Sequence, residues 1–329
     1  MKPRWGLMIA SILLATLVLR DSSAHAQPAP RIPARIAWVS VFPLSQVASY
    51  LDAFRSGLAA EGYVEGRDVE VLARSANGNP ERLPAVVEEV LALRPDVIVS
   101  QGAAIFGLRT VTRIPIVYGF SGDPIAADLT DSMARPGGNL TGVSFMTIEL
   151  NAKRLDILRT VAPQTRRVIL MGDPVHPGVD LEVAANQETA RQLGMEMRWV
   201  PTRNVREVSA FLASLDQDAP DALVILPDSV MLESREQVSE YALRHKIPAI
   251  SGWSMFAHSG GLLTYGPRLS ESFKRLAYYA VRILKGAKPS DLPIERPTQF
   301  ELVISLKTAR QIGLAVPDSL IALADEVVE

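Results

Sequence analysis

The chain repeats one stretch, Arg113-Ile114-Pro115-Ile116-Val117-Tyr118-Gly119-Phe120-Ser121, without a gap as Lys246-Ile247-Pro248-Ala249-Ile250-Ser251-Gly252-Trp253-Ser254. Each copy reads basic residue, Ile-Pro, a short apolar run, then glycine, an aromatic residue and serine. A second pair precedes them in the same order, Pro95-Asp96-Val97-Ile98-Val99 and Pro220-Asp221-Ala222-Leu223-Val224. Ile-Pro before a strand is common and can recur by chance. Two motifs in one order nevertheless predict that the chain contains the same unit twice.

Short apolar runs rich in valine and isoleucine recur along the chain and predict strands. They are Arg35–Val41, Val69–Ala73, Val97–Ser100, Ile116–Gly119, Val168–Met171, Leu223–Leu226 and Ala249–Ser251. Because these runs are apolar on both faces, they favour parallel sheets covered by helices on each side. Amphipathic helices are predicted between them, one with its apolar stripe at Val47, Leu51, Phe54 and Leu58. We therefore expect an α/β fold of two similar doubly wound parallel-sheet lobes joined by a hinge.

Composition excludes several classes of protein. The chain has 329 residues, enough for two domains, of which 48% are hydrophobic and 21% charged, as in soluble globular proteins. Lys and Arg number 34 against 36 Asp and Glu, so no positive field is available to hold nucleic acid. The chain has no cysteine, which excludes disulfides, thiolate metal sites and cysteine nucleophiles.

The first 26 residues read as a signal peptide. Lys2 and Arg4 precede an apolar run, residues 5–19, and Ala24-His25-Ala26 supplies small residues at the positions that a signal peptidase reads. A transmembrane anchor is the alternative, but the run falls short of the ~20 residues that a spanning helix needs. We expect cleavage after Ala26. Since no cysteine follows the run, no lipoprotein anchor is expected, and the mature protein should be free in the periplasm.

Ligands of open α/β sheets bind outside the carboxyl ends of the strands, so two such lobes place a cleft where their strand ends converge. The candidate ligand-binding residues at these ends are Ser40, Phe42, Gln101, Gly102, Ala103, Phe120, Ser121, Asp123, Asp228, Ser229 and Trp253. Phe120 and Trp253 occupy matching positions of the repeat and could hold a flat ligand between them, or else pack at the lobe edges. Asp123 and Asp228 could bind an amino group, although aspartate beside proline is also ordinary turn chemistry.

No catalytic constellation is present in the sequence. Neither G-x-G-x-x-G nor G-x-x-x-x-G-K-[ST] occurs, so the fingerprints for dinucleotides and nucleotide phosphates are missing. After cleavage the histidines His176, His245 and His258 are widely separated. We expect no enzyme activity, no metal and no cofactor. A cleft enzyme that uses Asp123 with Asp228 remains the less favoured alternative.

Several longer motifs resemble a known family. They include Phe54-Arg55-Ser56-Gly57-Leu58, Gly122-Asp123-Pro124, Ala134-Arg135-Pro136-Gly137-Gly138-Asn139-Leu140-Thr141-Gly142 and Gly260-Gly261-Leu262-Leu263-Thr264-Tyr265-Gly266-Pro267. On these motifs the chain resembles extracytoplasmic ABC-transporter substrate-binding proteins, of an uncharacterised type related to tryptophan/phenylalanine-binding members. The resemblance spans Ile32 to Glu329. It implies a periplasmic-binding-protein type I fold, in which three crossovers join two lobes.

The resemblance also implies a function and a division of the chain. The protein would close on a small molecule, such as an amino acid or an aromatic or carboxylate compound, and deliver it as a monomer to a membrane permease and its ATPase. A sensing module that docks on a receptor is the alternative. The N-terminal lobe would comprise residues 27–144 and about 252–295, and the C-terminal lobe 145–251 and about 296–329. One departure is Gly102-Ala103-Ala104, where the family often has Gly-Thr-Pro or Gly-Ser-Pro, so a hydroxyl contact to a ligand carboxylate is not expected here.

Overall fold

A computed structural model describes residues 33–110, 112–146, 148–215 and 219–329, which form two parallel-sheet α/β lobes. The predicted signal peptide, residues 1–26, and its cleavage site lie outside these residues. No helix in the described part of the chain is both long enough and apolar enough to cross a membrane.

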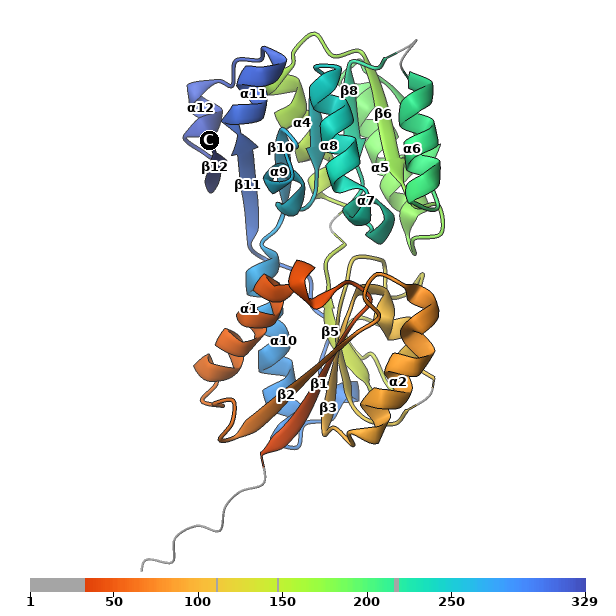
Figure 1. Cartoon of the computed structure of the whole chain (residues 1–329), viewed down its shortest axis with the longest axis vertical. Coiled ribbons are helices and arrows are strands. Elements are labelled where there is room, and N and C mark those ends of the chain that lie inside the picture. The colour runs from red at the N-terminus through yellow and green to blue at the C-terminus, as the bar shows by residue number, and fades with distance from the viewer. Residues whose placement is uncertain (1–32, 111, 147, 216–218) are drawn as a thin grey trace, which may run out of the picture. The chain divides into compact units, whose positions relative to one another are not determined.

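The first lobe is built on a five-stranded parallel sheet. Its strands, in spatial order, are β2 (Val69–Ser75), β1 (Ala34–Ser40), β3 (Val97–Gln101), β4 (Ile116–Phe120) and β5 (Leu140–Ser144). Figure 1 shows α1 (Ala48–Ala60) and α10 (Leu269–Leu284) on one side of this sheet and α2 (Leu83–Ala92) on the other. The short α3 (Ile105–Leu108) packs against α2. The short 3-10 turns of this lobe are η1 (Leu44–Gln46), η2 (Pro80–Arg82), η3 (Gly102–Ala104) and η5 (Pro289–Asp291).

Both faces of this sheet are apolar because its strands carry consecutive apolar residues, and successive side chains of a strand point to opposite faces. Trp38 and Val99 pack with α1 and α10, whereas the neighbouring Val39 and Ile98 pack with α2 and α3. All four side chains are fully buried. This confirms the prediction of a sheet covered on both sides.

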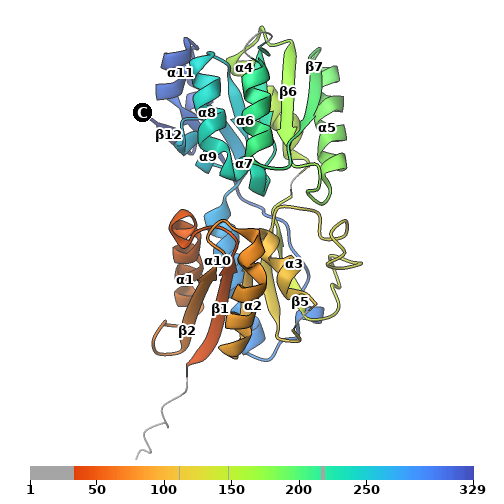
Figure 2. The ribbon, with the colours of Figure 1, turned by 45° about the vertical axis from the view of Figure 1, so that its right-hand side comes forward.

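The second lobe has a seven-stranded sheet. Its strands, in spatial order, are β12 (Glu326–Val328), β11 (Phe300–Ser305), β10 (Leu263–Pro267), β9 (Ala249–Ser251), β8 (Ala222–Ile225), β6 (Arg167–Gly172) and β7 (Glu196–Pro201). Only the β10–β11 pair is antiparallel. One face is covered by α4 (Leu150–Val161), α5 (Val179–Gln192), α11 (Leu306–Ile312) and α12 (Asp318–Ile321). The other face is covered by α6 (Val205–Ser214), α7 (Ser229–Glu233), α8 (Arg235–Arg244) and α9 (Met255–His258), with α6 and α8 side by side (Figure 2).

The repeated stretches form the same strand pair in both sheets. Ile98 of β3 is in register with Ile116 of β4, and their repeat partners Leu223 and Ala249 are in register between β8 and β9. A backbone hydrogen bond recurs with the register, because the N–H of Ile98 donates to the carbonyl oxygen of Pro115 at 2.9 Å and the N–H of Leu223 to that of Pro248 at 3.0 Å. The internal repeat of the sequence is therefore a structural repeat.

The chain passes between the sheets three times, after β5, after β10 and before β11. The first pass follows Ser144, the last residue of β5, and the third precedes Phe300, the first residue of β11. The second differs from the expectation, because β10 pairs with β9 and β11, so that residues 252–267 stay in the second lobe. The backbone of β10 at Gly266 lies very close to the backbone that follows β9. A Cβ on Gly266 would lie 1.7 Å from the carbonyl oxygen of Gly252, so only glycine fits at this position.

Candidate ligand-binding site

One cavity lies at the carboxyl ends of strands from both sheets. Its lining residues are Phe42, Tyr50, Gln101, Gly102, Gly119, Ser121, Phe145, Ser229, Leu232, Trp253, Leu269 and Phe273. Six of the eleven residues predicted from the sequence are thus brought together here, namely Phe42, Gln101, Gly102, Ser121, Ser229 and Trp253.

Two glycines shape the side of the cavity formed by the first lobe. Gly102 follows Gln101, the last residue of β3, and its φ of +60° starts the turn that leads into α3. Gly119 lies within β4, where a Cβ would stand 2.5 Å from Cζ of Phe145. The missing side chain of Gly119 therefore gives the Phe145 ring its place in the cavity wall.

The second lobe contributes residues that follow β8 and β9. Asp228 caps α7, since its Oδ1 accepts a hydrogen bond from the N–H of Met231 at 2.8 Å, and this short helix carries Ser229 and Leu232. Leu232 and Trp253 pack into the apolar cluster beneath α1 and α10 of the first lobe. The cavity is therefore walled by side chains from both lobes.

Five predicted residues do not line this cavity, and three of them are Ser40, Ala103 and Phe120. Ser40 is buried, and its Oγ accepts a hydrogen bond from the N–H of Phe42 at 3.1 Å, so it positions a lining residue instead. Ala103 lies in the turn before α3. Phe120 packs on the α2 side of the sheet, with its ring centroid 5.5 Å from that of Phe106, so it does not face Trp253. The reason is strand length: β4 continues to Phe120, whereas β9 ends two residues before Trp253.

The two predicted aspartates are occupied by local backbone groups. Oδ1 of Asp123 accepts hydrogen bonds from the N–H groups of Ile125 and Ala126 at 2.7 and 3.0 Å. Oδ2 of Asp228 accepts the N–H of Asp173 at 2.8 Å, so both of its oxygens are engaged. Burial raises the pKa of Asp228 to about 7. The turn-chemistry interpretation holds, and neither carboxylate lines the cavity.

Sequence reasoning missed five lining residues and placed a sixth, Gly119, only at the end of a predicted strand. The five are Tyr50, Phe145, Leu232, Leu269 and Phe273. Tyr50 comes from α1, and Leu269 and Phe273 come from the first turns of α10, so their helical spacing resembles that of core residues. A general rule of the fold could have found them. In a parallel α/β layer each helix begins near the carboxyl end of a strand, so the first turns of the helices also reach the cleft.

The cavity is small and uncharged. Its volume is about 30 Å³, far below the roughly 300 to 1,000 Å³ of pockets that hold small-molecule ligands. Tyr50 is its only titratable lining residue among those that the structure describes, and burial raises the pKa of this phenol, which keeps it neutral. A solute the size of an amino acid can therefore enter only when the lining residues move apart.

A loop contact joins the lobes beside this cavity. The backbone N–H of Asp123 donates to the carbonyl oxygen of Pro177 at 3.0 Å, and the His176 ring packs on Phe120 with the centroids 5.9 Å apart. Burial lowers the pKa of His176 to about 4, so the ring is neutral at physiological pH. Gly178 has a φ of +86°, and a Cβ there would lie 2.9 Å from Cβ of Asp123. The contact therefore depends on a glycine.

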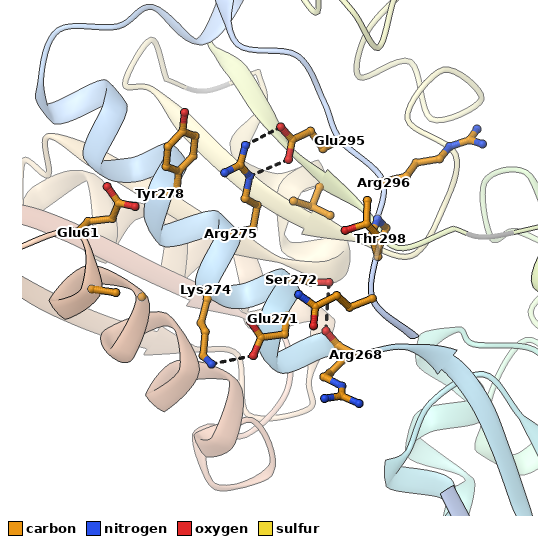
Figure 3. A pocket seen from close by; sticks show the side chains of 15 residues that line it. Glu61, Arg268, Glu271, Ser272, Lys274, Arg275, Tyr278, Glu295, Arg296 and Thr298 are labelled. Atoms are coloured by element: carbon orange, nitrogen blue, oxygen red, sulfur yellow. Dashed lines mark hydrogen bonds and ion pairs between the residues drawn. The ribbon is translucent and has the colours of Figure 1, made fainter. Parts of the chain in front are cut away.

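A larger groove of about 630 Å³ lies at the third crossover (Figure 3). Arg275 of α10 makes a two-bond ion pair with Glu295, both bonds being 2.7 Å long. The backbone of Glu295 in turn bonds to Gly142 and Ser144 of β5 at 3.0 and 2.9 Å. These contacts tie the third crossover to the first. The groove is lined by Val143 of β5, next to the first crossover, and by residues 295–299 of the third, so we assign it to the hinge.

Comparison with known families decides where the chain belongs. The family described as "ABC transporter substrate binding protein" matches residues 45–328. The chain belongs to this family. Among curated relatives of this substrate-binding protein is the "Tyrosine-binding protein" of Clostridioides difficile, 22% identical over 264 residues, which cover 79% of this chain and 75% of the relative.

Solved structures agree on the fold. The complex of an "ABC domain" from Streptococcus pneumonia with L-Trp superimposes with a TM-score of 0.82 at 21% identity, covering 90% of this chain and 100% of that one. A "conserved domain protein" from Vibrio cholerae gives a TM-score of 0.81 at 22% identity, covering 89% and 99%. An "ABC transporter Solute Binding Protein" from Agrobacterium vitis, bound with alpha-D-tagatopyranose, also shares this fold. It gives a TM-score of 0.64 at 15% identity, covering 88% of this chain and 98% of that one. The periplasmic-binding-protein type I fold expected from the sequence is confirmed.

Proposed function

We propose that this chain is the solute-binding component of an ABC importer. It closes its two lobes on a small molecule at the cavity between the strand ends and delivers that molecule to a membrane permease and its ATPase. The observation that supports this most strongly is the cavity itself, because Gln101 and Ser121 of one lobe line it together with Ser229 and Trp253 of the other. A ligand that contacts both sets of residues stabilises the arrangement in which they meet.

The lobes must open for the solute to enter and to leave. Since the cavity has a volume of only about 30 Å³ in this arrangement, a solute binds when the lobes are apart and is then enclosed. The three crossover segments absorb the movement, and the loop contact between Asp123 and Pro177 forms again on closure. The relatives named for tyrosine and complexed with L-Trp support a solute of aromatic amino-acid size.

Transport without chemistry is favoured over catalysis. The acid pair that a cleft enzyme would need, Asp123 and Asp228, is engaged with backbone N–H groups and does not line the cavity. We propose that the protein is not an enzyme and that it acts as an unanchored monomer in the periplasm after cleavage behind Ala26. Cell fractionation and the mass of the secreted protein test this, since the mature chain should begin at Gln27.

A thermal-shift screen of residues 27–329 tests the binding function. The screen should include amino acids, aromatic acids and amides, nucleosides and short carboxylates. A solute present at 100 times its Kd should raise the free energy of unfolding by about 2.7 kcal/mol. Recovery of the compound unchanged supports binding, whereas its consumption would establish catalysis. A screen without a single stabilising compound would count against solute binding.

A further inference from the structure

The lining of the cavity offers no charge to a ligand. Twelve residues form it, and none of these is Asp, Glu, Lys, Arg or His. The phenol of Tyr50 is buried and neutral. A free amino acid carries an ammonium and a carboxylate, and an ion buried without a partner is strongly disfavoured. The cavity therefore suits an uncharged ligand better than a zwitterion.

The charged groups nearest to the cavity are already engaged. Asp228, next to the lining residue Ser229, accepts two backbone N–H groups. Arg235 is the cation beside Leu232, but its Nη1 donates to the Leu232 carbonyl oxygen at 2.8 Å and its Nε to Oγ of Ser259 at 3.1 Å. Glu301 lies near Tyr50, but it forms an ion pair with Arg268, in which 3.8 Å separates Oε2 of Glu301 from Nε of Arg268. Recruiting any of these groups for a ligand would break bonds that the protein already makes.

Two neutral polar atoms of the lining are buried without a hydrogen-bond partner. They are the side-chain oxygen of Gln101 and the indole nitrogen of Trp253, whose residues are only 6% and 9% exposed. The first is an acceptor and belongs to one lobe, and the second is a donor and belongs to the other. Buried polar groups of this kind are hydrogen-bonded in stable states, so the bound ligand is the natural partner for both.

Most of the remaining lining is apolar and largely aromatic. Phe42, Phe145 and Phe273 supply rings, and Leu232 and Leu269 supply aliphatic surface. Aromatic walls favour a flat, apolar ligand body. The other polar side chains of the lining, those of Tyr50, Ser121 and Ser229, carry neutral hydroxyls, so every polar group that the lining offers a ligand is uncharged.

We infer that the ligand is an uncharged aromatic compound that donates a hydrogen bond to Gln101 and accepts one from Trp253. A primary amide or a similar neutral donor–acceptor group on an aromatic ring meets this description. The inference rests on the proposed solute-binding function and narrows its ligand class. It separates this chain from relatives whose names refer to free amino acids.

A ring-matched series tests the charge of the ligand by calorimetric titration of residues 27–329. The first set is indole-3-acetamide, indole-3-acetate, tryptamine and L-tryptophan, and the second is 4-hydroxyphenylacetamide, 4-hydroxyphenylacetate, tyramine and L-tyrosine. In at least one set the amide should bind at least ten times more tightly than the carboxylate, the amine and the amino acid with the same ring. A charged member that binds as tightly as its amide overturns the inference but supports solute binding. Failure of both amides to bind also overturns it, and the wider screen then decides the fate of the proposed function separately.

Substitution of Gln101 assigns the acceptor. Gln101→Met keeps the length of the side chain but removes its polar group, and it should weaken amide binding about tenfold. Gln101→Glu places a carboxylate in the same position and should reverse the preference in favour of tryptamine over the amide. Unfolding curves of both variants establish that they fold. Unchanged selectivity in folded Gln101→Glu would remove Gln101 from the site.

Discussion

The backbone N–H of Asp123 donates to the carbonyl oxygen of Pro177 across 3.0 Å, which links a loop of the first sheet directly to a loop of the second. This bond lies next to Ser121, which lines the cavity, and to His176, whose ring hydrogen-bonds with the backbone of Ser121. Contact between these loops and enclosure of a solute are therefore coupled. If closure is what binds the solute, damage to the loop contact should weaken binding without unfolding either lobe.

Gly178→Ala tests this coupling. The new Cβ would meet Cε of Met146 at 2.7 Å and Cβ of Asp123 at 2.9 Å, so the loops should be held apart. Gly194→Ala is the matched control at the other end of α5, because its φ of +70° is similarly left-handed but its Cβ would meet nothing within 4 Å. Both variants should lose about 1 kcal/mol of stability from the positive φ. Only Gly178→Ala should lose solute affinity, by tenfold or more in a calorimetric titration, and equal affinities would refute the coupling.

Trp253→Phe tests the donor in the cavity. Trp38→Phe is its control, because both indole nitrogens are buried without a partner, but Trp38 lies in the core of the first lobe. Each variant keeps a six-membered aromatic ring, so both should fold with a moderate loss of stability. Trp253→Phe should bind the solute about ten times more weakly, whereas Trp38→Phe should bind it as the unsubstituted chain does. Equal losses in the two variants would indicate a general packing effect.

Stability should fall as the pH rises from about 5 to 7.5. Burial raises the pKa of Glu182 to about 7, against the opposing pull of Arg154. Between the usual carboxyl pKa and this value the folded state keeps a proton that the unfolded state has lost, so unfolding becomes easier as the pH rises. Asp228 contributes in the same direction. His176 opposes them below about pH 6.5, because its lowered pKa leaves the folded state without a proton that the unfolded state binds. The net fall in the free energy of unfolding across this range should be about 2 to 4 kcal/mol.

Glu182→Gln should remove roughly half of this dependence of the free energy of unfolding on pH, measured by urea unfolding at pH 5 and pH 7.5. Glu188→Gln is the control on the same helix, because that side chain is half exposed and the neighbouring Arg191 and Gln192 hold the pKa of its carboxyl below the usual value. It should leave the slope between pH 5 and 7.5 intact. A slope that is unchanged by Glu182→Gln would show that this carboxyl is ionised in the folded protein.

The groove at the third crossover should prove structural. Arg275→Met removes the ion pair with Glu295, which is partly exposed and therefore worth about 1 kcal/mol or less. We expect a small change in stability and no change in solute affinity by titration. A tenfold loss of affinity in this variant would move the binding site to the groove.

Much of the fold could be predicted from the sequence because its signals are local. The seven apolar runs that predicted strands coincide with strands to within two residues at their ends, and the two copies of the predicted repeat form the pairs β3–β4 and β8–β9. Strands such as β7 and β10 were not predicted, because β7 is a polar edge strand and β10 contains glycine and proline. The second crossover was misplaced for the same reason, since β10 follows the expected boundary.

The site could be predicted only in part, because side-chain direction depends on where each strand ends. The repeat matches Phe120 with Trp253, but the longer β4 turns Phe120 to the far face of its sheet. Residues from helix starts, such as Phe273, carry an ordinary core pattern, and no local signal separates them from the residues beneath. Strand-end loops are visible in a sequence, whereas the helices that complete a cavity become visible only once the sheets are packed.

Tryptophan fluorescence of residues 27–329 during titration with the best solute from the screen tests whether the lobes enclose a solute against Trp253. Residues 27–329 contain three of the four tryptophans of the sequence, Trp38, Trp199 and Trp253, and of these three Trp253 lines the cavity. We predict a saturable change in emission that persists in Trp38→Phe, disappears in Trp253→Phe even at saturating solute, and leaves the compound chemically unchanged. A change that survives in Trp253→Phe, or a compound that is consumed, would contradict the account.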